Sequence, residues 1–196
     1  MLCAECDADL PRLTQPLCPR CALASPRGAL CGRCLADPPH YDATFAALAY
    51  EFPADTLVHA LKFRGELALS VFLGNMLREK VLPLQVDRVI AVPLSTARLR
   101  ERGYNQAVEI ARHVSPEKLD LGLCERSRDS APQMDLPFAE RQRNVRGAFR
   151  CMRALEGTIA VVDDVMTTGA TLDELAKTLK AAGASRVVNW VVARTF

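Results

Sequence analysis

The chain of 196 residues has no strong excess of either charge and no long apolar run. Its 25 Lys and Arg residues against 23 Asp and Glu residues leave a formal net charge of +2. Binding nucleic acid through bulk charge alone requires a much larger positive excess, so composition does not favour that class. No apolar stretch approaches the ~18 residues that a membrane span needs, and no secretory signal is recognisable. We therefore expect a cytoplasmic protein without a membrane span.

Hydrophobic residues nevertheless make up 49% of the chain. That content and this length are enough for one full core with a small appendage. From about residue 41 the pattern alternates between strands and helices. Strands are predicted at 43–50, 86–93, 119–124, 158–162 and 186–193, and helices at 55–62, 67–81, 105–114 and 171–182. Residues 125–153 look irregular and basic. This alternation predicts an α/β fold whose parallel sheet is covered by helices on both faces.

Cysteine is concentrated at the N-terminus. Six of the eight cysteines form three Cys-x-x-Cys pairs, namely Cys3 and Cys6, Cys18 and Cys21, and Cys31 and Cys34. Cytoplasmic thiols are kept reduced, so paired cysteines there favour metal over disulfides. Two such pairs complete a tetrahedral zinc site, and the nine residues between the second and third pairs suit a compact ribbon.

Six thiols cannot fill two sites of four ligands. We expect Cys18, Cys21, Cys31 and Cys34 to bind structural zinc. Cys3 and Cys6 are further candidate ligands, which either join the Cys18 pair or match another pair from an upstream segment. The surrounding sequence has no sustained helical or strand period, so it cannot bury much apolar surface and needs a cross-link such as a bound metal to fold. We therefore predict a zinc ribbon at 1–40 and a larger α/β domain at 41–196.

The most informative stretch is 158–171. Its β-branched apolar lead predicts a buried parallel strand, and Asp163 and Asp164 follow at the carboxyl end, where ligands gather in open α/β sheets. A turn rich in Thr and Gly then opens a helix, where N–H groups and hydroxyls form an anion site. An acid pair that can bind a diol beside such a site indicates a ribose 5-phosphate. The alternative is an acidic strand end followed by a Thr helix cap, without a ligand.

This arrangement resembles the 5-phosphoribosyl 1-pyrophosphate (PRPP) motif of the type I phosphoribosyltransferases. The resemblance implies that the acid pair contacts the ribose hydroxyls and that the loop wraps the 5′-phosphate. The residues it assigns to PRPP are Asp163, Asp164, Val165, Met166, Thr167, Thr168, Gly169, Ala170 and Thr171.

Three basic segments are candidates for the pyrophosphate. The loop after the strand at 86–93 carries Arg98 and Arg102, whose guanidinium forks suit phosphate oxygens; a solvated helix face is the alternative. Lys62 lies at a helix end, where it either caps the helix or reaches a phosphate. Residues 138–153 include Arg141 and are either a mobile lid or a patch for nucleic-acid backbone.

Taken together, the chain resembles the competence protein F (ComF) family over essentially its whole length. The residues that carry this resemblance are the Cys-x-x-Cys pairs, 61–65, Val92-Pro93, 102–106, 141–149 and the PRPP motif. It implies a zinc ribbon joined to a type I phosphoribosyltransferase fold. It also implies a role in natural competence and DNA uptake, with incoming single-stranded DNA and a competence helicase as partners. Many relatives begin with a further Cys-x-x-Cys pair, which is absent here.

One departure concerns the substrate. Enzymes of 6-oxopurine salvage carry an acid where this chain has Thr167, so we do not expect that activity. The primary expectation is a PRPP-binding protein of the ComF family that handles incoming single-stranded DNA. The alternative is an active phosphoribosyltransferase of nucleotide salvage, unrelated to DNA. In that enzyme a nitrogen nucleophile would displace pyrophosphate, with Asp163, Asp164, Arg102 and Arg141 as catalytic residues and Mg²⁺ bound with PRPP.

Overall fold

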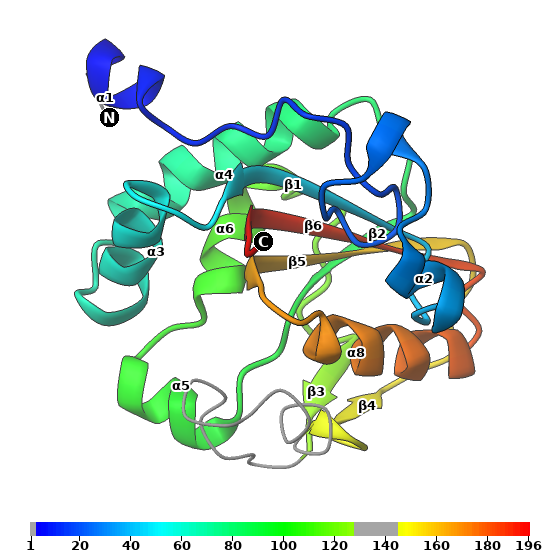
Figure 1. Ribbon diagram of the computed structural model, residues 1–196. Helices are drawn as coiled ribbons and strands as arrows, with labels where there is room; N and C mark the ends of the chain where they lie inside the picture. Colours follow the sequence, from blue (N-terminus) through cyan, green and yellow to red (C-terminus); the bar gives the residue numbers. More distant parts are fainter. Residues whose placement is uncertain (1–2, 128–144) are drawn as a thin grey trace.

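The computed structural model describes residues 3–127 and 145–196, and within them the core is a four-stranded parallel sheet (Figure 1). Its strand order is β1-β6-β5-β2. The strands are β1 (Ala43–Ala49), β2 (Arg88–Ala91), β5 (Thr158–Met166) and β6 (Arg186–Arg194). In the register, Val162 of β5 pairs with Ala91 of β2 and with Trp190 of β6.

Helices cover both faces of this sheet, which confirms the predicted fold class. One face carries α3 (Ala54–Phe63), α4 (Ala68–Val81) and α6 (Gln106–Val114), and the other carries α8 (Ala170–Ala181). Side chains alternate along each strand. Ala160 and Val162 of β5 therefore pack with the first layer, whereas Ile159 and Val161 pack with α8. Among the described residues, no helix has the length and apolar character that crossing a bilayer requires.

The region between β2 and β5 differs from the prediction. A short helix, α5 (Thr96–Arg102), lies where a basic loop was expected and a solvated helix face was the alternative. The strand predicted at 119–124 is wrong, because Leu119 makes a single bridge to Val89 and an Asx turn follows, in which the Gly122 N–H donates to Asp120 Oδ1 at 3.2 Å. Pairing resumes as a small antiparallel sheet of β3 (Cys124–Arg126) and β4 (Phe149–Cys151).

The N-terminal segment packs directly on the sheet. It contains α1 (Ala4–Ala8), the 3₁₀ turn η1 (Pro26–Gly28) and α2 (Gly32–Ala36). Residues 11–13 run antiparallel to β1: the Leu13 N–H donates to the Ala47 carbonyl at 3.3 Å, and the Ala49 N–H donates to the Pro11 carbonyl at 2.8 Å. These bonds cover an otherwise open sheet edge. The boundary predicted at residue 40 stays a prediction.

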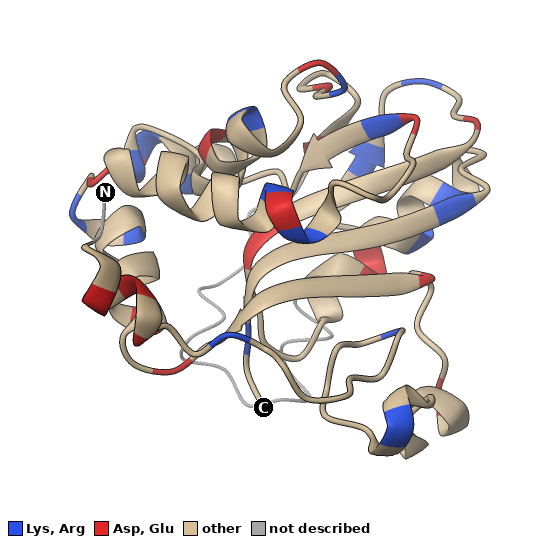
Figure 2. Ribbon diagram, turned by 90° about the horizontal axis from the view of Figure 1, so that it is seen from above, with Lys and Arg blue, Asp and Glu red and all other residues tan. Residues whose placement is uncertain are grey.

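Charged residues are mixed over the molecule. Seen from above, Lys and Arg alternate with Asp and Glu along the helices and loops (Figure 2). This distribution agrees with the net charge of +2. Specific recognition must therefore come from local groups of side chains.

Candidate functional site

A cavity of about 640 Å³ lies at the carboxyl ends of β2 and β5. The chain leaves β2 for the face covered by α6, and it leaves the adjacent β5 for the opposite face, which α8 covers (Figure 1). Ligands of open α/β sheets bind where the connections of neighbouring strands diverge in this way. The topology thus places the cavity at the point where a ligand is expected.

The acid pair belongs to β5 itself, which continues to Met166 instead of ending at residue 162. Alternation along the strand sends the two carboxyl groups to different sides. Asp164 is 2% exposed and its Oδ2 lies 2.5 Å from Nζ of Lys62 on α3. Asp163 is half-buried, and its Oδ1 accepts a hydrogen bond from the Asp164 N–H at 2.9 Å.

These environments separate the acidities of the two carboxyl groups. Burial raises the pKa of Asp163 well above its ordinary value, and the neighbouring Asp164 charge raises it further. Burial also disfavours an ionised Asp164, but the Lys62 ammonium outweighs it and lowers the pKa of Asp164. For Lys62, burial is likewise outweighed by the carboxylates, so its pKa is raised. Asp163 therefore keeps its proton to a higher pH than Asp164.

The turn after β5 brings the strand end and the start of α8 together. Gly169 has a φ of +84°, and a Cβ atom there would lie 2.7 Å from Met166 Cε and 3.1 Å from Tyr41 Oη. Any other residue would therefore be strained at this position. The Thr168 Oγ1 accepts a hydrogen bond from the Ala170 N–H at 3.2 Å, at the N-terminus of the 12-residue helix α8. That helix end favours an anion in the cavity.

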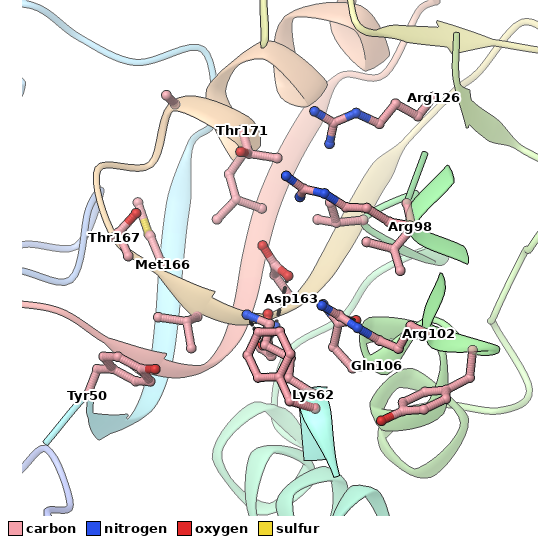
Figure 3. A pocket seen from close by; sticks show the side chains of 18 of the residues that line it. Tyr50, Lys62, Arg98, Arg102, Gln106, Arg126, Asp163, Met166, Thr167 and Thr171 are labelled. Atoms are coloured by element: carbon pink, nitrogen blue, oxygen red, sulfur yellow. Dashed lines mark hydrogen bonds and ion pairs between the residues drawn. The ribbon is translucent and has the colours of Figure 1, made fainter. Parts of the chain in front are cut away.

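Three arginines enter the cavity from the side opposite this turn (Figure 3). Arg98 and Arg102 lie one helical turn apart on α5, and Arg126 comes from β3. The Arg102 guanidinium lies 5.1 Å from the Phe63 ring centre and donates to Gln106 Oε1. Cationic side chains and the loop thus face one another across the cavity.

The neighbouring motif at 102–106 mainly sets the position of these cations. Gly103, with a φ of +81°, ends α5 in the left-handed conformation. Asn105 then caps α6, because its Oδ1 accepts the Ala107 N–H at 2.9 Å, while its Nδ2 donates to the Val92 carbonyl at 3.0 Å. The Tyr104 hydroxyl donates to the Leu61 carbonyl. The motif thereby ties α5 and α6 to β2 and α3.

All the described residues that were assigned to PRPP line this one cavity. They are Lys62, Arg98 and the residues 163–171, and Arg102 lies with them. Their role in binding stays a prediction. Arg141 lies outside the described residues. Tyr50 and Arg126 also line the cavity and were missed. Tyr50 follows β1 directly, so a parallel sheet that includes this strand would have predicted Tyr50 at the carboxyl edge. Arg126 lies on a three-residue strand, which is too short to give a periodic pattern in the sequence.

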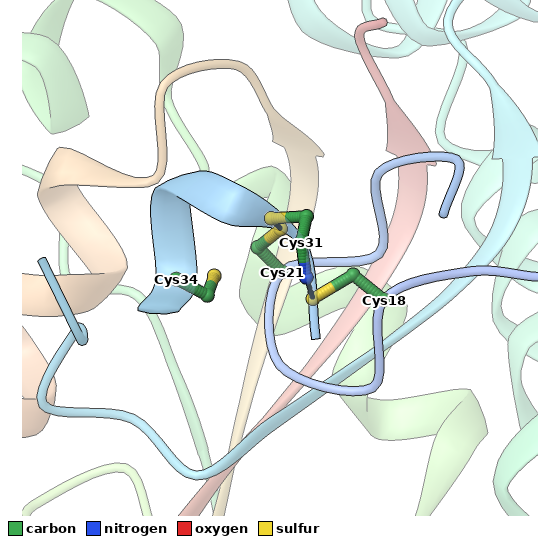
Figure 4. Close-up of side chains that lie close together, drawn as sticks. All are labelled: Cys18, Cys21, Cys31 and Cys34. Atoms are coloured by element: carbon green, nitrogen blue, oxygen red, sulfur yellow. Dashed lines mark hydrogen bonds between the residues drawn. The ribbon is translucent and has the colours of Figure 1, made fainter. Parts of the chain in front are cut away.

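The second and third cysteine pairs converge (Figure 4). The sulfur atoms of Cys18, Cys21, Cys31 and Cys34 all lie within 4.8 Å of one another, and those of Cys21 and Cys31 are 3.6 Å apart. Four thiolates at ~2.3 Å from a tetrahedral zinc are about 3.8 Å apart, so the four residues fit this ion.

The four thiols differ in acidity, because burial raises the pKa of Cys21 and of Cys34, whereas Cys18 is more acidic than usual. Burial favours the thiol of Cys18, but N–H groups including those of Cys21 and Cys31 lower its pKa to about 7. Cys3 and Cys6 are exposed in or beside α1 and lie outside the cluster. Their assignment as ligands stays a prediction.

Curated proteins of similar length resemble this chain throughout. It is 35% identical to the DNA utilization protein YhgH of Salmonella typhimurium over 206 residues, which cover 99% of this chain and 90% of that protein. The chain belongs to the YhgH and competence protein F family. The chain is 29% identical to competence protein F of Haemophilus influenzae, and the alignment covers 98% of this chain and 90% of that protein. The resemblance to the ComF family is thus confirmed, although no family model matches the chain.

Two solved structures align with part of this family member. The allosteric regulatory enzyme of purine biosynthesis matches 62% of the chain and 25% of its own length, at 20% identity and a TM-score of 0.40. The protein TT1426 from Thermus thermophilus matches 63% of this chain and 83% of its own length, at 18% identity and a TM-score of 0.35. Similarities at this level carry no argument about the site.

Proposed function

We propose that the cavity binds PRPP and that the protein uses this site in DNA utilisation. The observation that carries the proposal is the convergence of residues 163–171 on a single cavity, with cationic side chains facing them. A volume of about 640 Å³ is within the range of small-ligand sites. One stretch of chain thus supplies carboxyl groups, hydroxyls and a helix N-terminus to one ligand.

Each part of PRPP has a matching group in this arrangement. The carboxyl groups of Asp163 and Asp164 would accept hydrogen bonds from the ribose hydroxyls. The hydroxyls of Thr168 and Thr171 and the start of α8 would hold the 5′-phosphate. The pyrophosphate would then lie toward Arg98 and Arg102, whose forks can bind its oxygens in pairs. Mg²⁺ belongs to the same proposal, since it prefers phosphate and carboxylate oxygens and would enter with the pyrophosphate.

Calorimetric titration with PRPP and Mg²⁺ tests the site. Thr171→Val removes one hydroxyl at nearly constant volume and should weaken binding by about 1.5–3 kcal/mol, the range for a hydrogen bond to a charged group. Thr178→Val is the matched control, because Thr178 lies two turns further along α8 and donates to the Glu174 carbonyl. Wild-type protein that does not bind PRPP, or equal affinities of the two variants, would refute the assignment.

The role in DNA utilisation follows the names of the relatives, and it predicts single-stranded DNA and a competence helicase as partners. Phe63 supports contact with DNA, because it is 53% exposed at the cavity and has the Arg102 guanidinium over its ring. An exposed ring with a nearby cation can stack on an unpaired base. Fluorescence anisotropy with labelled single strands should show weaker binding for Phe63→Ala than for Phe52→Ala, which alters a ring that is 78% exposed elsewhere. Equal affinities would remove this support.

An active phosphoribosyltransferase of nucleotide salvage is the second candidate. It is favoured by the arginines opposite the loop, because they are placed to stabilise negative charge on a leaving pyrophosphate. Both candidates predict PRPP binding, and only this one predicts pyrophosphate release when a base is added. Assaying release with a panel of bases separates them: release with any base supports the transferase, and binding without release excludes it for that panel.

A further inference from the structure

We propose that residues 18–34, the cysteine module, brace residues 166–169, the phosphate loop of the proposed site. Arg194 and Arg33 are the positioning residues that couple the metal site to the ligand site. This inference rests on the proposed PRPP site and adds to it a regulatory link. Three observations support it, and they concern the two arginines, the orientation of the loop peptides and the packing around Gly169.

Arg194 joins the two sites through one buried guanidinium. It is the last residue of β6 and is 1% exposed. Its Nε donates to the carbonyl of the ligand candidate Cys21 at 2.9 Å. Its Nη1 donates to the Met166 carbonyl at 2.9 Å and also to the Thr167 carbonyl. Movement of the Cys21 turn must therefore disturb the side chain that holds the loop.

Arg33 provides a second link from the other cysteine pair. It lies between Cys31 and Cys34 on the short helix α2, and its Nη2 donates to the Thr168 carbonyl at 2.8 Å. Both halves of the four-thiol cluster are thus connected to consecutive carbonyl groups of the loop. The two arginines come from segments more than a hundred residues apart in the sequence.

These bonds help to hold the orientation of the loop peptides, and at the first of them the Met166 carbonyl also accepts the Thr195 N–H at 3.1 Å. In a trans peptide the carbonyl of one residue and the N–H of the next point in opposite directions. Holding the carbonyls of residues 166–168 toward the arginines therefore turns the N–H groups of Thr167, Thr168 and Gly169 away from them. That orientation suits donation to a 5′-phosphate, whereas a flipped peptide would present a carbonyl oxygen to it.

The packing around the loop also connects it to the cysteine module. The Tyr41 hydroxyl, in a side chain that is 3% exposed, lies 3.1 Å from the position of a Gly169 Cβ atom. A second cavity of about 620 Å³ lies between the loop and the cysteine module, and it is lined by Arg33, Cys34, Thr168 and Asp173 among others. Cys21, Cys34, Tyr41 and Met166 also belong to one buried hydrophobic cluster, so apolar contacts accompany the hydrogen bonds of the two arginines.

Coupling between two binding sites is reciprocal, so PRPP must tighten zinc binding if zinc favours the ligand-competent loop. The test follows zinc release from the full-length zinc-loaded protein to a chromophoric chelator, with and without PRPP. At equilibrium with the chelator, we expect PRPP to tighten zinc binding about five-fold or more, within the usual range of coupling. Arg33→Ala should abolish this effect and weaken PRPP binding about ten-fold. Arg27→Ala, which removes an exposed arginine of the same module, should retain both.

Hydrogen exchange of the amides at 167–170 in the absence of PRPP separates failure of the brace from failure of the proposed function. Faster exchange in Arg33→Ala, with circular dichroism unchanged, supports the brace even if PRPP does not bind. Arg194→Lys provides a second variant. Lysine keeps the charge, but its single ammonium group cannot reach both the Cys21 carbonyl and the loop carbonyls. Unchanged loop exchange in Arg33→Ala, or PRPP affinity equal to that of Arg27→Ala, would overturn the inference.

Discussion

Replacing Gly169 by alanine tests the close packing of the loop at residues 166–169. The residue has a φ of +84°, and an added methyl group would lie 2.7 Å from Met166 Cε and 3.1 Å from Tyr41 Oη. The left-handed conformation costs alanine about 1–2 kcal/mol. Met166 Cε ends a flexible side chain, but Met166 and Tyr41 are 1% and 3% exposed, so a shift of either must displace buried neighbours and overpacking adds about 1–3 kcal/mol. We expect Gly169→Ala to lower the free energy of unfolding by roughly 2–5 kcal/mol.

Gly103→Ala separates these two contributions. Gly103 has nearly the same φ, +81°, but a Cβ atom there would meet nothing within 4 Å. Urea unfolding of both variants and of the wild type gives the three free energies. The difference between the variants measures the contact contribution alone, about 1–3 kcal/mol. Equal destabilisation would refute the argument that the loop is closely packed against Met166 and Tyr41.

Other predictions concern charge and metal. The raised pKa of Asp163 means that the folded state holds this proton more tightly than the unfolded chain, so stability falls as pH rises from the ordinary carboxyl pKa toward the folded value. Asp163→Asn should therefore raise the free energy of unfolding more at pH 7 than at pH 4, and an equal gain at both pH values would contradict this. The same variant should bind PRPP more weakly in calorimetry. Metal analysis should find about one zinc ion per chain, lost in Cys31→Ser and kept in Cys3→Ser. Zinc retained in Cys31→Ser would exclude the four-thiol site.

The sequence predicts those parts of the fold that depend on long apolar runs. The strands β5 and β6 are buried on both faces, so their apolar runs were sufficient to find them. The helix α5 was missed because it has no buried residue and depends on its ends, the Ser95 cap and Gly103. The pairing of β3 with β4 was missed for a similar reason, since three-residue strands have no measurable period. Local signals were therefore insufficient wherever partners distant in the sequence determine the structure.

The same distinction applies to the site. Residues 163–171 lie together because they are consecutive, and their motif was recognisable without a structure. Arg194 reaches the loop only because β6 pairs in parallel with β5, which aligns it with Met166. An arginine at the end of an apolar strand would ordinarily be placed in solvent, yet here its guanidinium is buried and donates to four backbone carbonyl groups of other residues. A role of this kind could not be inferred from spacing or composition.

The charge of the cavity restricts the ligands that it can accept. Among residues 3–127 and 145–196, the cavity is lined by the cationic side chains of Lys62, Arg98, Arg102 and Arg126 and by the carboxyl groups of Glu101, Asp163 and Asp164. Asp163 has a raised pKa, and Lys62 lies in an ion pair with Asp164. The acid pair thus contributes less negative charge than two free carboxylates would, and the lining as a whole favours an anion. A neutral nucleoside could donate hydrogen bonds to the carboxyl groups, but it carries no negative charge to interact with the cationic side chains. The ligand that we propose, a sugar with phosphate groups at both ends, would bring negative charge to the start of α8 and to the arginines on the opposite side.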